Sequence, residues 1–97
     1  MSKRDLIAKN RVAILALATK HGATNVRVFG SVARGEDDAA SDIDVLVNME
    51  PGRSLMDMGG LLMDLRELLG CTVDVISEHK DMRPHFRDNV LRDAVPV

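Results

Sequence analysis

Residues 41–47 read Ser-Asp-Ile-Asp-Val-Leu-Val, an apolar run that opens with two aspartates. Aspartate is poorly suited to β-strands and an unpaired carboxylate is costly to bury, so Asp42 and Asp44 require a common partner. In a strand, two such residues project from one face, about 6 to 7 Å apart, while Ile43 and Val45 point to the other. The run therefore predicts a strand that packs through one face and presents carboxylates on the other.

A third aspartate, Asp74, lies in a second apolar run, Thr-Val-Asp-Val-Ile at 72–76. The segment between the runs can form a helix long enough for a right-handed crossover, so we expect the two strands to be parallel. Because neighbouring strands are about 4.8 Å apart, Asp74 would then lie beside Asp42 and Asp44. Three carboxylates at one edge can hold one or two divalent cations, and Mg²⁺ prefers oxygen ligands.

A glycine-serine turn precedes these strands, in the stretch Phe-Gly-Ser-Val-Ala-Arg-Gly at 29–35. Gly30 would let the backbone approach a phosphate group, and Ser31 would donate a hydrogen bond to a phosphate oxygen. If the strand at 25–29 runs antiparallel to the strand at 42–49, this turn reaches the edge that carries the aspartates. Carboxylates for metal beside a phosphate-binding turn indicate nucleotide chemistry.

Arg34 has two interpretations of equal weight. It lies one helical turn after Gly30 and could neutralise a further phosphate charge. It could equally form a surface ion pair with Glu36 or Asp37.

Helices and strands alternate along the chain. We expect an α+β fold in one domain, 1–97, with a three-stranded mixed sheet flanked by helices that pack on one face. The expected elements are a helix at 2–21 that stops at Gly22, a strand at 25–29, a helical turn at 31–34, a strand at 42–49, a helix at 54–69, a strand at 72–76 and a last helix at 82–94.

The helix at 54–69 carries the clearest start and stop signals. Ser54 and Asp57 form a capping-box pattern, and Gly70 suits a left-handed C-terminal cap. The pair Gly59-Gly60 weakens its first turns, since glycine costs roughly 1 kcal/mol relative to alanine inside a helix. Either the backbone packs closely at that pair or the helix begins later.

The composition limits the partners. With 97 residues, 45% of them hydrophobic, and a formal charge of −2, the chain lacks the basic excess of proteins that wrap nucleic acid. One cysteine, Cys71, forms no internal disulfide, and no apolar run approaches membrane-spanning length. His21, His79 and His85 lack metal-ligand spacing. We therefore expect a soluble, cytoplasmic protein that contacts neither membrane nor nucleic acid directly.

The interval from Gly30-Ser31 to Asp42-Ile43-Asp44, followed by Asp74 in a later strand, closely resembles the DNA-polymerase-beta-like nucleotidyltransferase superfamily. Four stretches resemble its minimal nucleotidyltransferase (MNT) branch: Gly-Ser-Val-Ala-Arg-Gly, Ser-Asp-Ile-Asp-Val-Leu-Val, Val-Asp-Val-Ile and Leu-Arg-Asp-Ala-Val-Pro-Val. Members of that branch are typically antitoxins paired with HEPN-domain ribonuclease toxins.

The resemblance implies a nucleotidyltransferase fold and an activity. The chain would move AMP from ATP to a tyrosine of its toxin, with two Mg²⁺ ions held by Asp42, Asp44 and Asp74. Two alternatives stay open. The chain could be an antitoxin that silences the toxin by contact alone, or a transferase that modifies a small-molecule hydroxyl.

Overall fold

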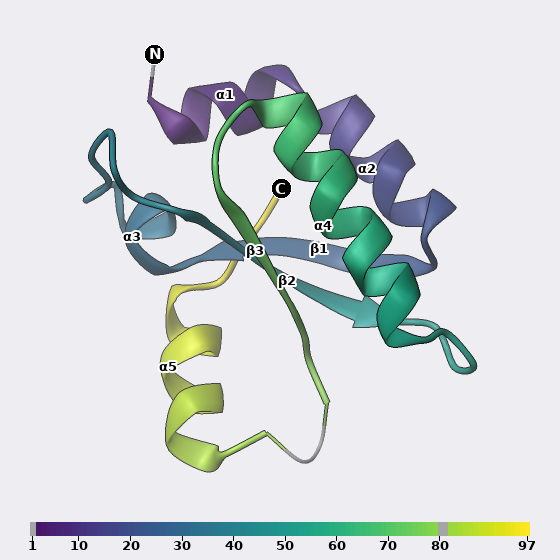
Figure 1. The fold of residues 1–97 in the computed structure, drawn as a ribbon. Coiled ribbons are helices and arrows are strands. Elements are labelled where there is room, and N and C mark those ends of the chain that lie inside the picture. Colours follow the sequence, from purple (N-terminus) through teal and green to yellow (C-terminus); the bar gives the residue numbers. More distant parts are fainter. Residues whose placement is uncertain (1, 80–81) are drawn as a thin grey trace.

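A computed structural model describes residues 2–79 and 82–97. Within these residues a four-stranded mixed sheet lies between helices (Figure 1). In chain order the elements are α1 (Lys3–Lys9), α2 (Arg11–Lys20), β1 (Ala23–Phe29), α3 (Gly30–Arg34), β2 (Ile43–Met49), α4 (Leu55–Leu69), β3 (Val73–Ser77), α5 (Pro84–Asp93) and β4 (Val95–Pro96). No helix in the described part of the chain is long and apolar enough to cross a membrane.

The strand order in the sheet is β3-β2-β1-β4. β2 pairs with β3 in parallel, as the sequence predicts. β1 pairs with β2 in antiparallel fashion, which meets the condition under which the Gly30 turn reaches the edge with the aspartates. The prediction of three strands is wrong by one, because β4 pairs with β1 through Val28 and Val95. This two-residue strand contains Pro96, which has no N–H to donate to a ladder and is therefore tolerated only at an edge.

Helices cover both faces of the sheet, not one as predicted. Val28 and Val45 face a core that also holds Leu61 and Leu65 of α4 and Ile14 of α2. The alternate positions Phe29 and Leu46 point the other way and pack with Val90 of α5. Figure 1 shows α5 below the sheet, opposite α1, α2 and α4. Phe29 and Leu46, which alternate along β1 and β2 with the residues of the first core, form this second, smaller core with Val90.

The predicted first helix is divided at Asn10. Its backbone (φ −105°, ψ 14°) leaves the helical region, and its side chain donates to Leu6 O at 2.8 Å. Asparagine competes with helical hydrogen bonds in this way, which explains the break between α1 and α2. The predicted stop after α2 is confirmed, since Gly22 adopts φ +77°.

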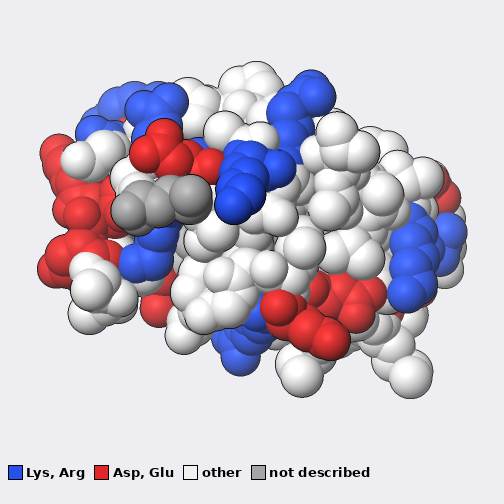
Figure 2. Space-filling model, turned by 90° about the horizontal axis from the view of Figure 1, so that it is seen from above, with Lys and Arg blue, Asp and Glu red and all other residues white. Residues whose placement is uncertain are grey.

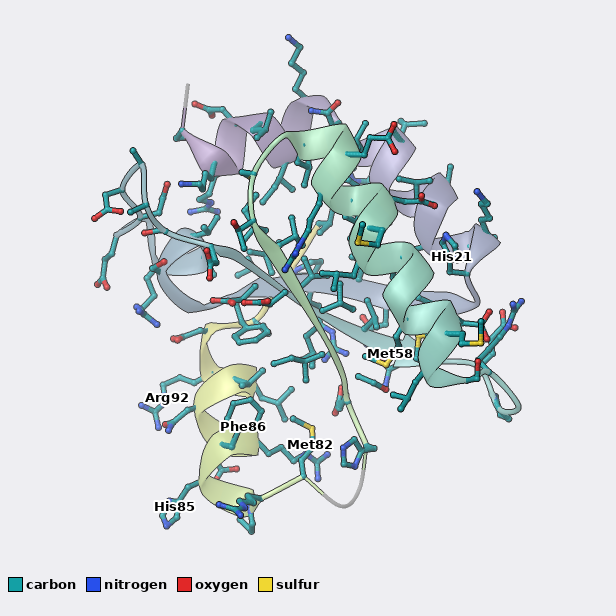
Figure 3. The ribbon with its side chains drawn as sticks, viewed as in Figure 1. His21, Met58, Met82, His85, Phe86 and Arg92 are labelled. Carbon is teal, nitrogen blue, oxygen red and sulfur yellow. The ribbon has the colours of Figure 1, made fainter. Side chains whose placement is uncertain are left out.

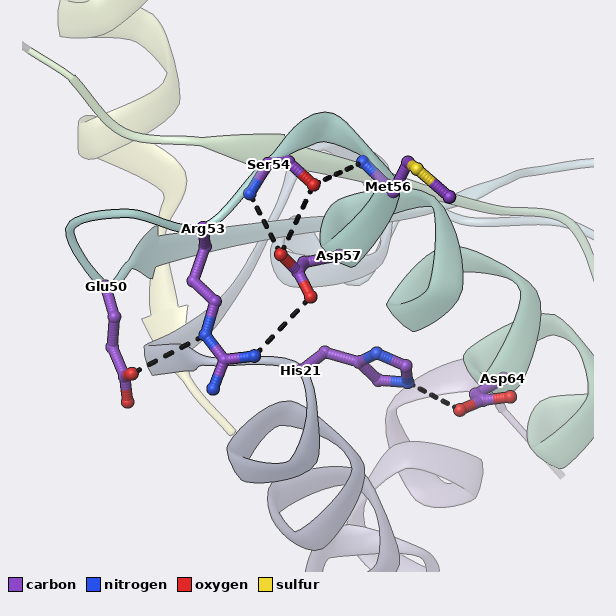
Figure 4. Close-up of polar contacts among 7 residues, drawn as sticks. All are labelled: His21, Glu50, Arg53, Ser54, Met56, Asp57 and Asp64. Atoms are coloured by element: carbon purple, nitrogen blue, oxygen red, sulfur yellow. Dashed lines mark hydrogen bonds and ion pairs between the residues drawn. The ribbon is translucent and has the colours of Figure 1, made fainter.

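The capping box of α4 is confirmed and shown in Figure 4. The Ser54 hydroxyl accepts from Met56 N at 3.2 Å, and Asp57 Oδ2 accepts from Ser54 N at 2.9 Å. The helix runs through both glycines. A Cβ at Gly60 would lie 2.7 Å from Cε1 of His21, whereas one at Gly59 would meet nothing within 4 Å. Close packing against His21 therefore explains why position 60 is glycine, but it does not explain the glycine at position 59.

Candidate active site

Asp44 and Asp74 are directly paired neighbours on the parallel strands β2 and β3. Paired residues of adjacent strands point to the same face of a sheet. This is the face of Leu46, which lies two residues after Asp44 and packs toward α5. Asp42 stands just before β2, two residues from Asp44. The structure thus brings the three predicted carboxylates to one rim of the sheet.

The charges of the three aspartates act on one another. Partial burial raises the pKa of the Asp44 carboxyl, and the negative charges of Asp74 and then Asp42 raise it further, while Arg34 opposes the rise. A carboxylate in this setting favours either a proton or a cation. The raised pKa of Asp44 thus reflects burial first and the two neighbouring acids second, and Arg34 compensates only in part.

The residues at this rim fit Mg²⁺ by their chemistry, although they form no preassembled metal cage. Within residues 2–79 and 82–97, no three His, Cys, Asp or Glu side chains converge closely enough to hold a metal ion by themselves. Mg²⁺ is commonly bound by one or two carboxylates together with substrate phosphates and water. A repelling pair such as Asp42 and Asp44, with Asp74 alongside, matches that mode of binding.

The Gly30 turn reaches the same rim, because β1 runs antiparallel to β2 and Phe29 pairs with Asp44. Gly30 begins α3 with φ +75°, and a Cβ there would lie 2.5 Å from Asp44 Oδ2. Ser31, the next residue, is partly exposed. The absence of a side chain at position 30 lets the turn and the carboxylate approach each other closely.

Arg34 forms two ion pairs at the end of α3. Its Nε lies 2.9 Å from Glu36 Oε2, and its Nη1 lies 2.6 Å from Asp93 Oδ2 of α5. These hydrogen bonds, first to Glu36 and then to Asp93, raise the pKa of the Arg34 guanidinium above its ordinary value. The predicted surface ion pair with Glu36 is confirmed, and Asp93 is a partner that the sequence did not indicate.

The loop between α3 and β2 adds negative charge beside the site. It carries Glu36, Asp37 and Asp38, and Lys3 of α1 donates to Asp38 O at 2.6 Å. Figure 2 shows red side chains gathered at the left edge of the molecule, the side on which Figure 1 places this loop.

Two features lie apart from the rim. His21 and His85 are at opposite ends of the molecule, one beside α4 and one at the far end of α5 (Figure 3), in line with their lack of ligand spacing. A cavity of about 540 Å³ lies between α1 and β4, where Arg4, Arg11 and Val97 are among its lining residues. It contains none of the predicted site residues, so the candidate site lies outside this cavity.

Sequence reasoning missed one residue that reaches the rim. Arg66 of α4 lies with Nη2 at 3.7 Å from Asp74 Oδ1. Its position on the helix gave no signal, because the contact depends on how the crossover places α4 against β3.

The chain is similar to known proteins over most of its length. The model of the nucleotidyltransferase domain family matches residues 11–97. The "Putative protein adenylyltransferase MJ0435" of Methanocaldococcus jannaschii is 40% identical over 84 residues, which cover 87% of this chain and 89% of that protein. "Protein adenylyltransferase MntA" of Thermococcus cleftensis is 36% identical over 81 residues, which cover 84% of this chain and 81% of that protein.

Two solved structures share the fold. One, described as a "putative minimal nucleotidyltransferase", is 48% identical with a TM-score of 0.85, and the match covers 100% of this chain and 97% of the other. A second, described as a "toxin-antitoxin with AMP-PNP", is 20% identical with a TM-score of 0.74 and shows likeness of fold alone; the match covers 90% of this chain and 71% of the other. This chain therefore belongs to the nucleotidyltransferase domain family, as a minimal nucleotidyltransferase, and is a transferase enzyme.

Proposed function

We propose that this chain transfers AMP from ATP to a hydroxyl group of a partner protein and acts as the antitoxin of a toxin–antitoxin module. Relatives named protein adenylyltransferases support the activity, and the fold neighbour described as a toxin-antitoxin with AMP-PNP supports the module. The observation that carries the proposal is the pairing of Asp44 with Asp74 at the rim that the Gly30 turn reaches.

The three aspartates would hold Mg²⁺, with Asp42 and Asp44 as the main ligands and Asp74 as a ligand to a second ion. Bound Mg²⁺ neutralises phosphate charge and makes the attacking hydroxyl easier to deprotonate. The support in this structure is the raised pKa of Asp44, which burial and the neighbouring acids cause and which a cation would reverse.

The transfer itself is a displacement at phosphorus. The acceptor oxygen forms a bond to the α-phosphorus of ATP while the bond from that phosphorus to the bridging oxygen of the β-phosphate breaks. Pyrophosphate leaves with the electron pair, and Asp74 takes the proton of the hydroxyl. The Ser31 hydroxyl donates to a phosphate oxygen, and Gly30 allows the backbone to approach it.

Arg34 has a conditional role in this scheme. Its guanidinium is shared between Glu36 and Asp93, so a contact with phosphate requires it to exchange one carboxylate for a phosphate oxygen. Such an exchange is chemically reasonable because guanidinium binds both groups with the same planar geometry.

We further propose that the partner is a HEPN-domain ribonuclease toxin and that the acceptor is a tyrosine hydroxyl. Both follow from the resemblance of the motifs at 30–44 and 72–76 to the MNT branch. A gene for such a toxin next to the gene for this chain would support the pairing. The absence of such a neighbouring gene would favour a small-molecule acceptor.

The decisive experiment mixes the purified chain, the neighbouring gene product, ATP and Mg²⁺ and measures the mass of each protein. We expect the partner to gain the mass of AMP on tyrosine and to lose ribonuclease activity. The double variant Asp42→Ala with Asp44→Ala should abolish the mass change, while Asp88→Ala, which removes an exposed carboxylate from α5, should preserve it.

The same mixture separates catalysis from inhibition by contact. If the double variant still silences the toxin without modifying it, binding alone is sufficient. If neither protein gains mass in the wild-type mixture under any metal condition, the transfer proposal is wrong.

A further inference from the structure

Arg66 connects the two faces of the sheet at its open edge. It projects from the last turn of α4, which packs on the face opposite the carboxylates. Its Nε donates to Val73 O at 3.0 Å, and its Nη2 lies 3.7 Å from Asp74 Oδ1. Because β3 is the edge strand of the sheet formed by the described residues, no further strand of that sheet blocks this path. The guanidinium can therefore reach around β3 to the side that carries Asp74.

Asp74 is exposed and lies beside another acid. Its side chain is 52% exposed on the edge strand, and the neighbour across the ladder is Asp44, whose negative charge repels it. In the described part of the chain, Arg66 is the basic side chain that lies within ion-pair distance of Asp74. The positive charge of Arg66 offsets part of the repulsion that the Asp74 carboxylate meets from Asp44.

The geometry of Arg66 allows it to orient the Asp74 carboxylate and leave the carboxylate oxygens free for other contacts. The hydrogen bond to Val73 O fixes the plane of the guanidinium, so little further conformational entropy is lost when its Nη2 faces Asp74. The 3.7 Å separation is longer than a direct hydrogen bond, which for N–H to oxygen is about 2.7 to 3.2 Å. Arg66 therefore attracts the Asp74 carboxylate by charge. The two carboxylate oxygens of Asp74 stay available to a proton or a cation.

We propose that Arg66 is a positioning residue that restricts the carboxylate of Asp74 to one orientation at the rim and offsets part of its repulsion with Asp44. The inference rests on the proposed function for its catalytic consequence, since Asp74 is the group that receives the proton there. The contact itself stands independently of which hydroxyl is the acceptor.

The kinetic test uses three single variants in the AMP-transfer assay. Arg66→Gln should lower kcat between about 10- and 100-fold, the usual cost of losing a residue that orients a ligating side chain, while KM for ATP changes little. Arg66→Lys keeps the charge without the Nε contact to Val73 and should recover part of kcat. Arg53→Gln is the matched control, because Arg53 pairs with Glu50 and Asp57 at the other end of α4 (Figure 4) and should leave kcat unchanged.

A double-mutant cycle decides whether Arg66 acts through Asp74. If it does, Arg66→Gln added to Asp74→Asn should cost much less than it costs alone, measured under single-turnover conditions with long incubations. Full additivity of the two losses would overturn the proposal. An unchanged kcat in Arg66→Gln would overturn it as well, even if that variant unfolds at a lower temperature, because the arginine would then only connect α4 to β3.

A second measurement needs no turnover. The three-bond Hα–Hβ couplings of Asp74, measured by NMR in the absence of nucleotide, should report one dominant χ1 rotamer in the wild-type chain and in Arg53→Gln. In Arg66→Gln they should move toward averaged values. Identical couplings in all three proteins would overturn the positioning role. An inactive wild-type chain with an Arg66-dependent rotamer would instead refute the proposed function and leave the positioning contact established.

Discussion

Gly30 and Asp44 approach so closely that a β-carbon at residue 30 would lie 2.5 Å from Oδ2 of the carboxylate. Such a distance is shorter than any ordinary carbon–oxygen contact. Position 30 also requires a left-handed backbone, with φ +75°. Position 30 thus requires glycine for two reasons, which are the left-handed backbone conformation and the space beside the Asp44 carboxylate.

Gly30→Ala should therefore lose both stability and activity. The left-handed backbone costs alanine about 1 to 2 kcal/mol, and the new methyl group must displace the Asp44 carboxylate. The control is Gly35→Ala, because Gly35 has a similar φ of +72° but no atom within 4 Å of a new Cβ. We expect similar losses of stability from the backbone but a large loss of AMP transfer only in Gly30→Ala. Equal activity in the two variants would contradict the close approach.

Asp44→Asn should raise the stability of the metal-free protein while it abolishes transfer. Because burial and the charges of Asp74 and Asp42 raise the pKa of Asp44, the folded chain binds that proton more tightly than the unfolded chain. The contribution of Asp44 to the free energy of unfolding therefore falls as the pH rises from the ordinary aspartate pKa through the raised one.

The measurement is thermal unfolding in EDTA as a function of pH. Asp44→Asn should unfold at a higher temperature than the wild type at pH 7, and the difference should shrink as the pH falls toward about 3. Asp88→Asn, on the exposed side of α5, serves as the control and should follow the wild type. A lower unfolding temperature for Asp44→Asn at pH 7 would mean that burial and the neighbouring acids do not together disfavour the charged form of Asp44.

Gly59→Ala and Gly60→Ala should affect stability in opposite directions. Both glycines lie inside α4, where alanine is favoured by about 1 kcal/mol. Position 59 is open, so the gain should appear there in full. At position 60 the methyl group would lie 2.7 Å from the ring of His21, which is hydrogen-bonded to Asp64 at 2.7 Å (Figure 4). Chemical denaturation of both variants measures the difference.

The hydrogen bond between His21 and Asp64 should make stability sensitive to acid. The hydrogen bond from His21, followed by the charge of Lys20, lowers the pKa of the Asp64 carboxyl. A carboxyl with a lowered folded pKa stabilises the protein above its unfolded pKa, and this contribution disappears as the pH falls through the lowered value. The stability gap between the wild type and Asp64→Asn should therefore be present at pH 6 and close in acid. A gap that is independent of pH would show that the pair contributes nothing by its charge.

Arg34 and Asp93 provide a test of the two interpretations of Arg34. If Arg34 contacts phosphate, Arg34→Gln should raise KM for ATP about tenfold, as expected for a lost hydrogen bond to a charged group. Asp93→Asn would then lower KM or leave it unchanged, because it releases the guanidinium from its partner at 2.6 Å. An unchanged KM in both variants would leave Arg34 as a surface ion pair alone.

The sequence by itself determined the strand at 42–49, the strand at 72–76 and their parallel pairing, because alternation and the length of the crossover permit few other arrangements. The two strands and their parallel pairing already place Asp42, Asp44 and Asp74 close together, because backbone geometry fixes the spacing along a strand and between strands. The capping box of α4 is equally local, because Ser54 and Asp57 satisfy each other's neighbouring N–H groups.

The tertiary structure alone decided the second core, the fourth strand and the partners of the site. Phe29 and Leu46 could be assigned to a face by alternation, but only the return of α5 beneath the sheet shows that they pack with Val90. The contacts Arg34–Asp93 and Arg66–Asp74 join residues far apart or on opposite faces. The contacts of long flexible side chains such as arginine leave no periodic pattern in the sequence. They depend on where the folded backbone places their partners.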